Sequence, residues 1–502
     1  MSEQPRDIAM REITIVGGGL AGWYAAVRLV HAMRGRKVTV RVVHAAPAGE
    51  AADPLDVLCA STLPAQHVAH AELGLEERGF MRACRATFKL ATEYRGLTDP
   101  ARSYLLPHGE IGARLEAVGF HQVMNRLAHA GRALDIDEFS VPAIAARLGR
   151  FAHPSPDARS VLSTFEYAYH LDTHGYTRLL RAFALKLGAV AVDAALAGVE
   201  LAGDGGNIAA VTLADGQRVG GDLFIDCTGA RSALLGEALR VPFDSWQSWL
   251  PCDRAVVMAV SAFEPPAPFT RISAEPGGWS WQVPLRDQLV QGLVFDGNRV
   301  DADAALDKAS RAQAGARALR FTNGRRREAW RANCVALGAA AGFLEPLAST
   351  GLQLINEGVT RLVALFPDRG SAAVVAPEYN RMMGAMYDGA RDFVLLHYLL
   401  SKRAEAPWNG QVAAALPDSL ARRVELFRYR GRVVLNDDEI FEEPDWACTF
   451  VGQGEKPTHY SILADQADDA EVAAQVAKIA RVMQAAAQTL PPHHVYLERY
   501  LA

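Results

Sequence analysis

A glycine-rich turn after a short apolar strand constrains the fold of this chain more than any other feature. Residues Glu12–Val16 favour a strand, Gly17-Gly18-Gly19-Leu20-Ala21-Gly22 follows, and helix-forming residues continue to Val30. In a G-x-G-x-x-G turn, the first glycine allows the tight turn, the second lets a pyrophosphate approach the backbone, and the third packs the helix on the strand. The helix N-terminus then faces the phosphates. The pattern predicts a Rossmann-like α/β fold that binds a dinucleotide through Gly17, Gly19, Leu20, Ala21 and Gly22.

A second strand, predicted over Val38–Val43, completes the βαβ unit. The acid that usually holds the adenosine ribose is expected at the end of this strand, where the chain has His44. Two interpretations are open: either His44 bonds the ribose, or the adenosine end is held loosely.

Two distant segments indicate which dinucleotide is bound. Leu223–Gly229 is typical of a buried strand that runs into a glycine loop, and Gly338–Gly342 follows another core strand, Val335–Gly338. A site assembled from three separate segments favours FAD over NAD, which is held by one contiguous unit. Gly338 and Leu344 are the expected FAD contacts in the last segment.

The remaining pattern predicts the domain organisation. A helix is expected from about Tyr176 to Gly188, one strand over Arg218–Ile225, and a helix from Leu352 to Phe366 that Pro367 ends. Residues Asp253–Gly297 alternate like an antiparallel sheet, and the chain beyond Val374 is mainly helical. We expect a discontinuous FAD-binding domain over residues 1–400, a substrate-side sheet inserted at about 241–325, and a helical C-terminal part over 401–502 that packs over the substrate pocket.

Charge and composition exclude several classes of function. Lys and Arg number 52 against 57 Asp and Glu, so no basic surface for nucleic acid is expected. No window approaches the ~20 apolar residues of a membrane span, and the N-terminus does not resemble a secretory signal. We therefore expect a cytoplasmic protein. The six cysteines show no metal-ligand spacing, so we expect reduced, mostly buried thiols and no metal. The pair His493-His494 is expected to be solvated.

The sequence resembles the flavin-dependent tryptophan halogenases, and the match runs along nearly the whole chain. The W-x-W-x-[IV]-P segment is the most specific part of the match. The matching segments are Gly17–Trp23, Ala86–Leu90, Tyr169–Asp172, Phe224–Gly229, Gly278–Pro284, Gly342–Leu347, Ser349–Gly351 and Arg391–Phe393.

The resemblance implies a two-component enzyme. Reduced FAD from a separate flavin reductase reacts with oxygen to a C4a-hydroperoxide, and halide attack on it gives hypohalous acid. This oxidant passes through a tunnel to a lysine beside an electron-rich, indole-like substrate, either a small molecule or peptide-borne. The family lysine corresponds to Lys89. From the residues alone, Lys89 is either an ordinary strand lysine with its head in water or an ammonium held in an apolar pocket. A homodimer is also plausible by resemblance.

The resemblance also places the tunnel and halide residues. Trp279 and Trp281 are two residues apart, so on a strand both point to one face. In the family this pair lies at the tunnel, and Pro284 ends the same segment. The family halide contacts correspond to Thr350 and Gly351, where the start of the helix from Leu352 favours an anion. A plain helix cap is the alternative interpretation.

Three departures from the family pattern fall on the catalytic, flavin and substrate regions. The second glutamate of E-P-L-E-S-T is Ala348, so the supporting acid is either Glu345 or absent. The family stretch G-V-G-E-A-T-x-P is replaced by Val57–Pro64, which predicts a remodelled flavin loop. His108 replaces an aromatic that sandwiches the substrate, and Trp446 is the expected remaining aromatic wall.

These departures leave two further hypotheses beside an FAD-dependent halogenase. One is a flavin monooxygenase or oxidase on the same scaffold, because Ala348 cannot transfer a proton. The other is a non-catalytic homologue that binds flavin or another ligand. Oxygen in the product without halide would favour the first, and failure to bind oxidised or reduced FAD would favour the second.

Overall fold

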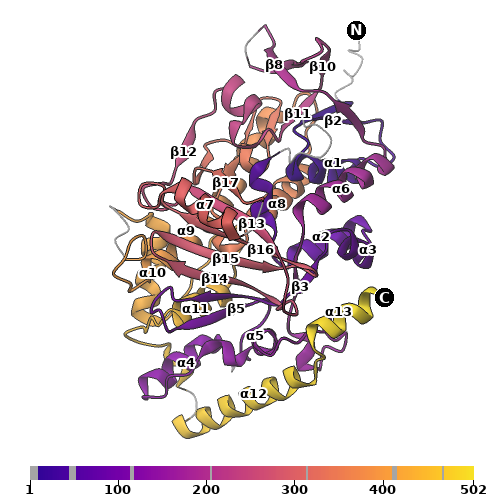
Figure 1. Ribbon diagram of the computed structural model, residues 1–502. Helices are drawn as coiled ribbons and strands as arrows, with labels where there is room; N and C mark the ends of the chain where they lie inside the picture. The colour runs from indigo at the N-terminus through magenta and orange to yellow at the C-terminus, as the bar shows by residue number, and fades with distance from the viewer. Residues whose placement is uncertain are drawn as a thin grey trace, which may run out of the picture.

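The computed structural model describes residues 9–44, 53–113, 118–203, 206–312, 315–409, 415–465 and 468–502. A six-stranded sheet in the order β19-β20-β11-β1-β2-β7 forms the upper part of Figure 1. All its neighbouring strands are parallel except β19 and β20. The strands are β1 (Glu12–Val16), β2 (Thr39–His44), β7 (Val190–Asp193), β11 (Leu223–Asp226), β19 (Trp330–Arg331) and β20 (Cys334–Ala336).

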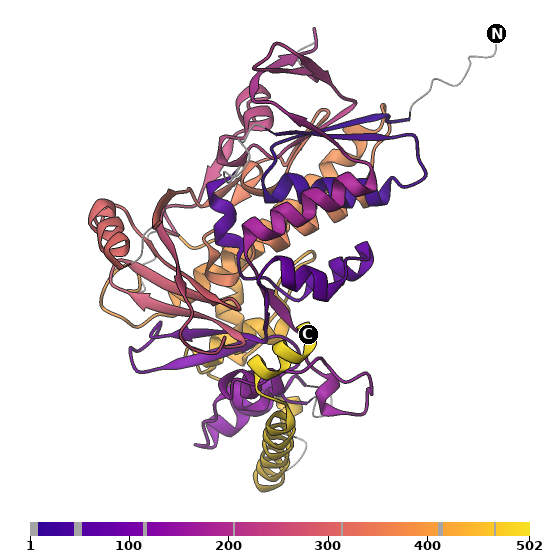
Figure 2. The same cartoon turned by 45° about the vertical axis from the view of Figure 1, so that its right-hand side comes forward.

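Helix α1 (Leu20–Ala32) packs on both α6 (Thr173–Leu187) and α8 (Gly351–Ala364), and Figure 2 shows α1 and α6 side by side. Two glycines make the start of α1 possible. Gly17 has a φ of +116°, and a Cβ on Gly22 would lie 1.8 Å from the Gly17 carbonyl oxygen. Only glycine fits both positions, because a side chain would force the helix away from β1. The predicted Rossmann-like α/β fold is confirmed.

A second, seven-stranded sheet has the order β17-β13-β16-β15-β14-β4-β5. Its centre is the antiparallel layer that the alternation over Asp253–Gly297 predicts. Its edges come from distant parts of the chain, and β14 pairs in parallel with β4. This pairing brings the strand after Lys89 onto the sheet. The strands are β4 (Ala91–Arg95), β5 (Ser103–Pro107), β13 (Arg254–Ser261), β14 (Phe269–Glu275), β15 (Gly278–Pro284), β16 (Gln288–Phe295) and β17 (Arg317–Arg320).

The single strand predicted over Arg218–Ile225 is wrong, because the chain changes sheet in its middle. β10 (Arg218–Gly220) pairs with β9 (Ile208–Leu213), which pairs with β8 (Leu196–Leu201). β11 joins the six-stranded sheet instead. Between them, the Asp222 carboxylate accepts hydrogen bonds from the backbone N–H groups of Arg11 and Glu12, at 2.7 and 3.1 Å. Apolar alternation continues through this junction, so it does not reveal the break.

The C-terminal part of the chain is helical. α12 packs on α4 and α5 at the end of the molecule opposite the six-stranded sheet (Figures 1 and 2). No described helix is long and apolar enough to cross a membrane. The division of the chain at residue 400 stays a prediction. The helices are α4 (Phe120–His129), α5 (Val141–Arg147), α9 (Ala372–Leu399), α10 (Asp418–Arg430), α11 (Glu443–Gly452), α12 (Asp469–Thr489) and α13 (His493–Leu501).

Shorter elements complete the described chain, and two of them carry much of the site. These are β3 (Thr87–Lys89) and β6 (Ala168–His170), which pair with each other. The others are α2 (Ala65–Leu73), α3 (Glu77–Ala83), α7 (Ala302–Ala312), β12 (Phe243–Ser245), β18 (Gly324–Arg326), β21 (Gly342–Phe343) and short 3₁₀ or π turns such as Pro54–Cys59 and Pro346–Ala348.

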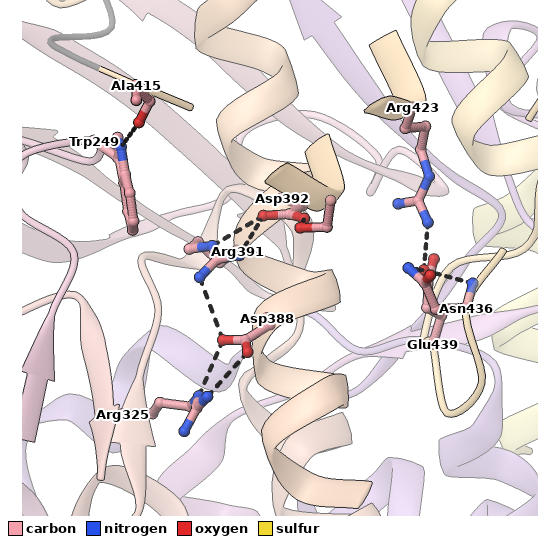
Figure 3. A network of polar contacts seen from close by, with 10 residues as sticks. Trp249, Arg325, Asp388, Arg391, Asp392, Ala415, Arg423, Asn436 and Glu439 are labelled. Atoms are coloured by element: carbon pink, nitrogen blue, oxygen red, sulfur yellow. Dashed lines mark hydrogen bonds and ion pairs between the residues drawn. The ribbon is translucent and has the colours of Figure 1, made fainter. Parts of the chain in front are cut away.

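A partly buried polar network joins α9 to β18 (Figure 3). Arg325 of β18 forms hydrogen bonds of 3.0 and 2.9 Å with the Asp388 carboxylate of α9. Asp388 also accepts from Arg391, whose guanidinium binds Asp392 at 2.7 and 2.9 Å. Because α9 packs on the Pro346–Ala348 turn, this network holds the turn in place.

Two sequence predictions concern buried side chains. All six cysteines are free and five are buried, as predicted. The prediction for His493 is wrong: it is 1% exposed, and its Nδ1–H donates to the Pro266 carbonyl at 2.8 Å. Burial lowers the pKa of His493 to about 4, so the imidazole is neutral. The polar composition around it does not show that α13 folds back onto the body of the protein.

Candidate active site

Lys89 lies at the end of β3 and is completely buried. Its Nζ donates hydrogen bonds to the Thr62 carbonyl at 3.0 Å and to Ser349 Oγ at 3.3 Å. No carboxylate in the described part of the chain bonds to this nitrogen. Burial lowers the pKa of Lys89 to about 7, because a charged ammonium is poorly solvated in the interior. Near neutral pH, both the ammonium and the amine are therefore populated, and the interpretation of Lys89 as a solvated strand lysine is wrong.

The segment Ala348–Gly351 separates two cavities. Ala348 lines a large cavity on one side, and Gly351 lines the cavity beside the glycine turn on the other. Between them, Ser349 has a left-handed backbone, with φ of 57°, and contacts Lys89. A non-glycine residue in this conformation costs about 1 kcal/mol or more and persists only where its surroundings fix it. The strained residue, Ser349, is therefore the one that binds the lysine, and its neighbours in the chain line the two cavities.

The large cavity has a volume of about 500 Å³. Tyr94, Phe165 and Phe441 supply aromatic walls. His108 is 7% exposed, and its Nε2 has no partner in the described chain. Burial, and then the charge of Lys89, lower the pKa of His108 well below its usual range, so the imidazole is neutral. The carboxyl side chains that line the cavity are Glu110, Glu166, Glu442 and Asp445, and no lysine or arginine of the described chain lines it.

Trp446 is not an aromatic wall of this cavity, in contrast to the sequence expectation. It is fully buried on α11, where the Arg423 guanidinium stacks 3.9 Å from its ring centroid. Arg423 binds the Glu439 carboxylate in turn (Figure 3). Trp446 therefore packs within the C-terminal part, and Phe441 lines the cavity instead.

Trp279 and Trp281 lie on one face of β15, as their spacing predicts, with ring centroids 6.0 Å apart. The Trp279 Nε1–H donates to Glu345 Oε1 at 3.2 Å, and Asn323 donates to Glu345 Oε2 at 3.2 Å. The Tyr398 hydroxyl donates to the same carboxyl. Burial raises the pKa of Glu345 to about 7. Glu345 therefore accepts from three donors, of which Asn323 and Tyr398 fix the carboxyl that orients Trp279, and it makes no hydrogen bond to Lys89.

The cavity beside the glycine turn fits a dinucleotide. Gly19, Ala21, Gly338 and Leu344 line it, and the missing side chains of its glycines leave backbone open for close approach. At the first turn of α1, the Leu20 N–H donates to Asp56 Oδ2 at 2.8 Å. A phosphate oxygen accepts this bond in a helix N-terminal anion site. The glycines therefore fit FAD, and Asp56 accepts from the backbone donor that a diphosphate would use.

His44 lies next to this cavity but does not line it. Its ring packs against Gly18, and its Nε2 lies 3.0 Å from Asp193 Oδ1 on β7. Its Nδ1 is buried without a partner in the described chain. A role for His44 at the ribose stays a prediction.

Thr350 stands at the start of α8, where the sequence predicts halide contacts. Its side chain is fully buried and makes no capping hydrogen bond. Its Oγ1 has no partner in the part of the chain that the structure describes. A buried hydroxyl without a partner is costly. The unpartnered Thr350 hydroxyl therefore favours a ligand at this position over a plain helix cap.

Comparisons with known proteins agree with this geometry. The family model "Tryptophan halogenase" matches residues 12–469, so the chain belongs to the tryptophan halogenase family. Tryptophan 7-halogenase KtzQ of Kutzneria sp. (strain 744) is 29% identical over 98% of this chain and 99% of its own length. Tryptophan 6-halogenase SttH of Streptomyces toxytricini is 32% identical over 85% of each chain.

Two solved structures are similar over nearly their whole length. BrvH, a flavin-dependent halogenase from Brevundimonas sp. BAL3, has a TM-score of 0.91 and 35% identity, covering 99% of this chain and 100% of its own. Xcc4156, a flavin-dependent halogenase from Xanthomonas campestris, has a TM-score of 0.91 and 36% identity, covering 98% of each. The protein is therefore a flavin-dependent halogenase of an aromatic substrate with FAD as its cofactor, which confirms the predictions of fold, family and cofactor.

Sequence reasoning missed four residues that the structure brings to the site. Asp56 occupies the start of α1, and Ser61, Thr270 and His170 lie behind Lys89. His170 belongs to the Tyr169–Asp172 match, so a signal was present. Ser61 lies before α2 and Thr270 lies on β14, so no local pattern of residues predicts that their hydroxyls meet.

Proposed function

We propose that this enzyme halogenates an electron-rich aromatic bound in the 500 Å³ cavity, with Lys89 as the catalytic residue. The observation that carries the proposal is the position of Ser349, which binds Lys89 and stands between Ala348 at the substrate cavity and Gly351 at the FAD cavity. Bound reduced FAD, which a separate flavin reductase delivers, supplies the electrons that turn oxygen and halide into hypohalous acid. Lys89 lies between the source of this oxidant and the aromatic ring.

Residues of the chain itself then bind halide, receive the oxidant and separate the substrate from the flavin. Thr350 Oγ1 and the backbone of Gly351 hold halide at the start of α8, where the helix dipole favours an anion. Lys89 receives the oxidant through the one Nζ position that its two acceptors leave open. Trp279, oriented by Glu345, keeps the aromatic substrate apart from the flavin.

The lining of the cavity indicates the substrate class. Among the residues that the structure describes, four carboxyl side chains border it and no lysine or arginine does, so a substrate carboxylate meets like charge. A cationic amine meets opposite charge there. Burial, together with Glu442 and Glu166, raises the pKa of Asp445 to about 7. We infer an indole-like substrate with a neutral or cationic substituent, small or peptide-borne. His108 lines the same cavity, and its Nε2, which has no partner in the described chain, is the group that we propose for a hydrogen bond to the polar ring atom.

The test compares three indoles whose 3-substituents carry an ammonium, both an ammonium and a carboxylate, or a carboxylate alone: tryptamine, tryptophan and indole-3-propionate. Each is incubated with the enzyme, a flavin reductase, NADH, FAD and bromide, and kcat/KM is measured from halogenated product. We expect tryptamine to exceed indole-3-propionate by at least tenfold, with tryptophan between them. A preference for the propionate would contradict the substrate class, and product from Lys89→Met would contradict the catalytic role.

Ala348 keeps one alternative open, a flavin monooxygenase on the same scaffold. The two are separated by incubation under ¹⁸O₂ without halide. Incorporation of ¹⁸O into the aromatic would favour the monooxygenase, and its absence together with halide-dependent product would favour the halogenase. A homodimer stays a prediction.

A further inference from the structure

A continuous line of hydrogen bonds runs from Lys89 through the interior to the end of β15. Ser349 Oγ donates to Ser61 Oγ at 3.0 Å, and the Ser61 and Thr270 hydroxyls are 2.7 Å apart. Thr270 Oγ1 lies 2.9 Å from His170 Nε2, His170 Nδ1 lies 3.0 Å from Thr87 Oγ1, and Thr87 Oγ1 donates to the Pro284 carbonyl at 2.7 Å. The five side chains are at most 8% exposed. We call Ser349, Ser61, Thr270, His170 and Thr87 the hydroxyl–imidazole chain.

The Pro284 carbonyl fixes the direction of every bond in this chain. A carbonyl oxygen only accepts, so the single hydrogen of the Thr87 hydroxyl is committed to it. Thr87 therefore accepts from His170 Nδ1–H. A neutral imidazole with its proton on Nδ1 has a lone pair on Nε2, so Thr270 donates to His170.

The same reasoning continues to the lysine. Because the Thr270 hydrogen is committed to His170, Thr270 accepts from Ser61, and Ser61 accepts from Ser349. The hydrogen of Ser349 therefore points away from Lys89. Toward Lys89, Ser349 Oγ is only an acceptor, as the Thr62 carbonyl is by its chemistry.

We propose that the hydroxyl–imidazole chain, polarised by Pro284, restricts the titration of Lys89 to one position of its Nζ. Two positions always carry a hydrogen, because both neighbours only accept. The third carries a hydrogen in the ammonium and a lone pair in the amine, and the two protein contacts are the same in both forms. Thr270 and His170 are thus positioning residues for Lys89. The value of this arrangement for catalysis rests on the proposed function, but its existence does not.

The groups around the lysine make hydroxyl direction the main polar control on it. His108 and His170 face Lys89, and His493 lies beyond them toward His170. All three are imidazoles whose pKa burial lowers, so they are neutral near pH 7. No carboxylate shifts the pKa of Lys89, for which burial is the cause.

The experiment removes the middle hydroxyl and measures the ionisation of Lys89 directly. In Thr270→Val the side chain keeps its shape but loses its hydrogen bonds. Ser61 and Ser349 can then turn, so that Ser349 donates to the amine lone pair and stabilises the neutral form. We expect the pKa of Lys89 to fall by about 0.5–1 pH unit, which corresponds to one hydrogen bond. Thr270→Ser keeps the hydroxyl and is expected to keep the pKa of the wild-type protein.

The readout is the pH titration of ¹³Cε-lysine signals by NMR, in the protein without FAD, halide or substrate. The chain has seven lysines, and Lys89→Met identifies the signal of Lys89. Ser61→Ala, which breaks the chain next to Ser349, is expected to lower the pKa in the same direction. Thermal melting confirms that each variant is folded.

An unchanged Lys89 pKa in folded Thr270→Val and Ser61→Ala would overturn the proposal. An equal fall in Thr270→Ser would also overturn it, because packing rather than hydroxyl direction would then be the cause. Since the titration needs no turnover, its result stands whether or not the halogenase reaction is detected, and the two hypotheses fail separately.

Discussion

The carboxylate of Asp56 accepts a 2.8 Å hydrogen bond from the backbone N–H of Leu20, at the point where helix α1 begins. This is the donor that a dinucleotide phosphate uses in a glycine-turn site. Asp53 lies close enough to raise the pKa of Asp56, although burial is the larger cause. Without FAD, the chain therefore places its own acid in the phosphate site.

The first prediction follows from this competition. Asp56→Ala removes the competing acceptor, so FAD is expected to bind about three- to tenfold more tightly, an effect of about 1 kcal/mol. Flavin fluorescence titration measures the dissociation constant. The exposed Asp157→Ala is the control and is expected to change nothing. Weaker binding in Asp56→Ala would mean that the acid supports the FAD site.

The second prediction concerns the lysine itself. Lys89→Met is expected to lower halogenation by at least about 10²–10³-fold while FAD remains bound, because a thioether neither donates a hydrogen bond nor forms an N–halogen bond. Lys89→Arg is expected to fail equally, since a planar, permanently charged group cannot present a lone pair. Product is measured by mass spectrometry and FAD binding by fluorescence. Activity above a tenth of wild type in either variant would refute the role.

The third prediction uses the low pKa of Lys89, about 7 against the usual 10.5. Between pH 7 and 10.5 the unfolded chain binds a proton there that the folded chain does not, so this group makes the free energy of unfolding rise with pH. At pH 7 and below, wild type carries the cost of the buried amine or ammonium, which Lys89→Met lacks. The melting temperature of Lys89→Met is therefore expected to exceed that of wild type most near pH 7 and least near pH 10. A gap that is constant with pH would contradict the buried, neutralised lysine.

The fourth prediction tests the missing acid. Ala348 lines the substrate cavity beside Ser349, so a glutamate placed there reaches the oxidant and the lysine. Ala348→Glu is expected to raise the pKa of Lys89 and to increase the halogenation rate by up to about 10²-fold, the usual size of an acid–base contribution. Ala348→Gln, of similar size without charge, is the matched control. If both variants lose activity equally, the cavity has no room for the side chain and the prediction fails.

The local features of the sequence determined the α/β core and the identity of the lysine. Gly17, Gly19 and Gly22 act through their own backbone geometry, and Trp279 and Trp281 act through a two-residue spacing. Such features need only neighbouring residues, so they can be recognised before the chain is folded. The role of Lys89 is predicted only because the segment around it resembles a family motif. A lysine between two apolar residues has no functional pattern of its own.

Only the tertiary structure decided which side chains of the site lie together. The fold brings the Thr270 and Ser61 hydroxyls within 2.7 Å across 209 positions of sequence. It also leaves Trp446 outside the lining of the cavity and buries His493, both in contrast to the sequence expectations. Burial and hydrogen-bond direction are properties of contacts between distant segments. Burial lowers the pKa of Lys89, and no local pattern of residues carries that information.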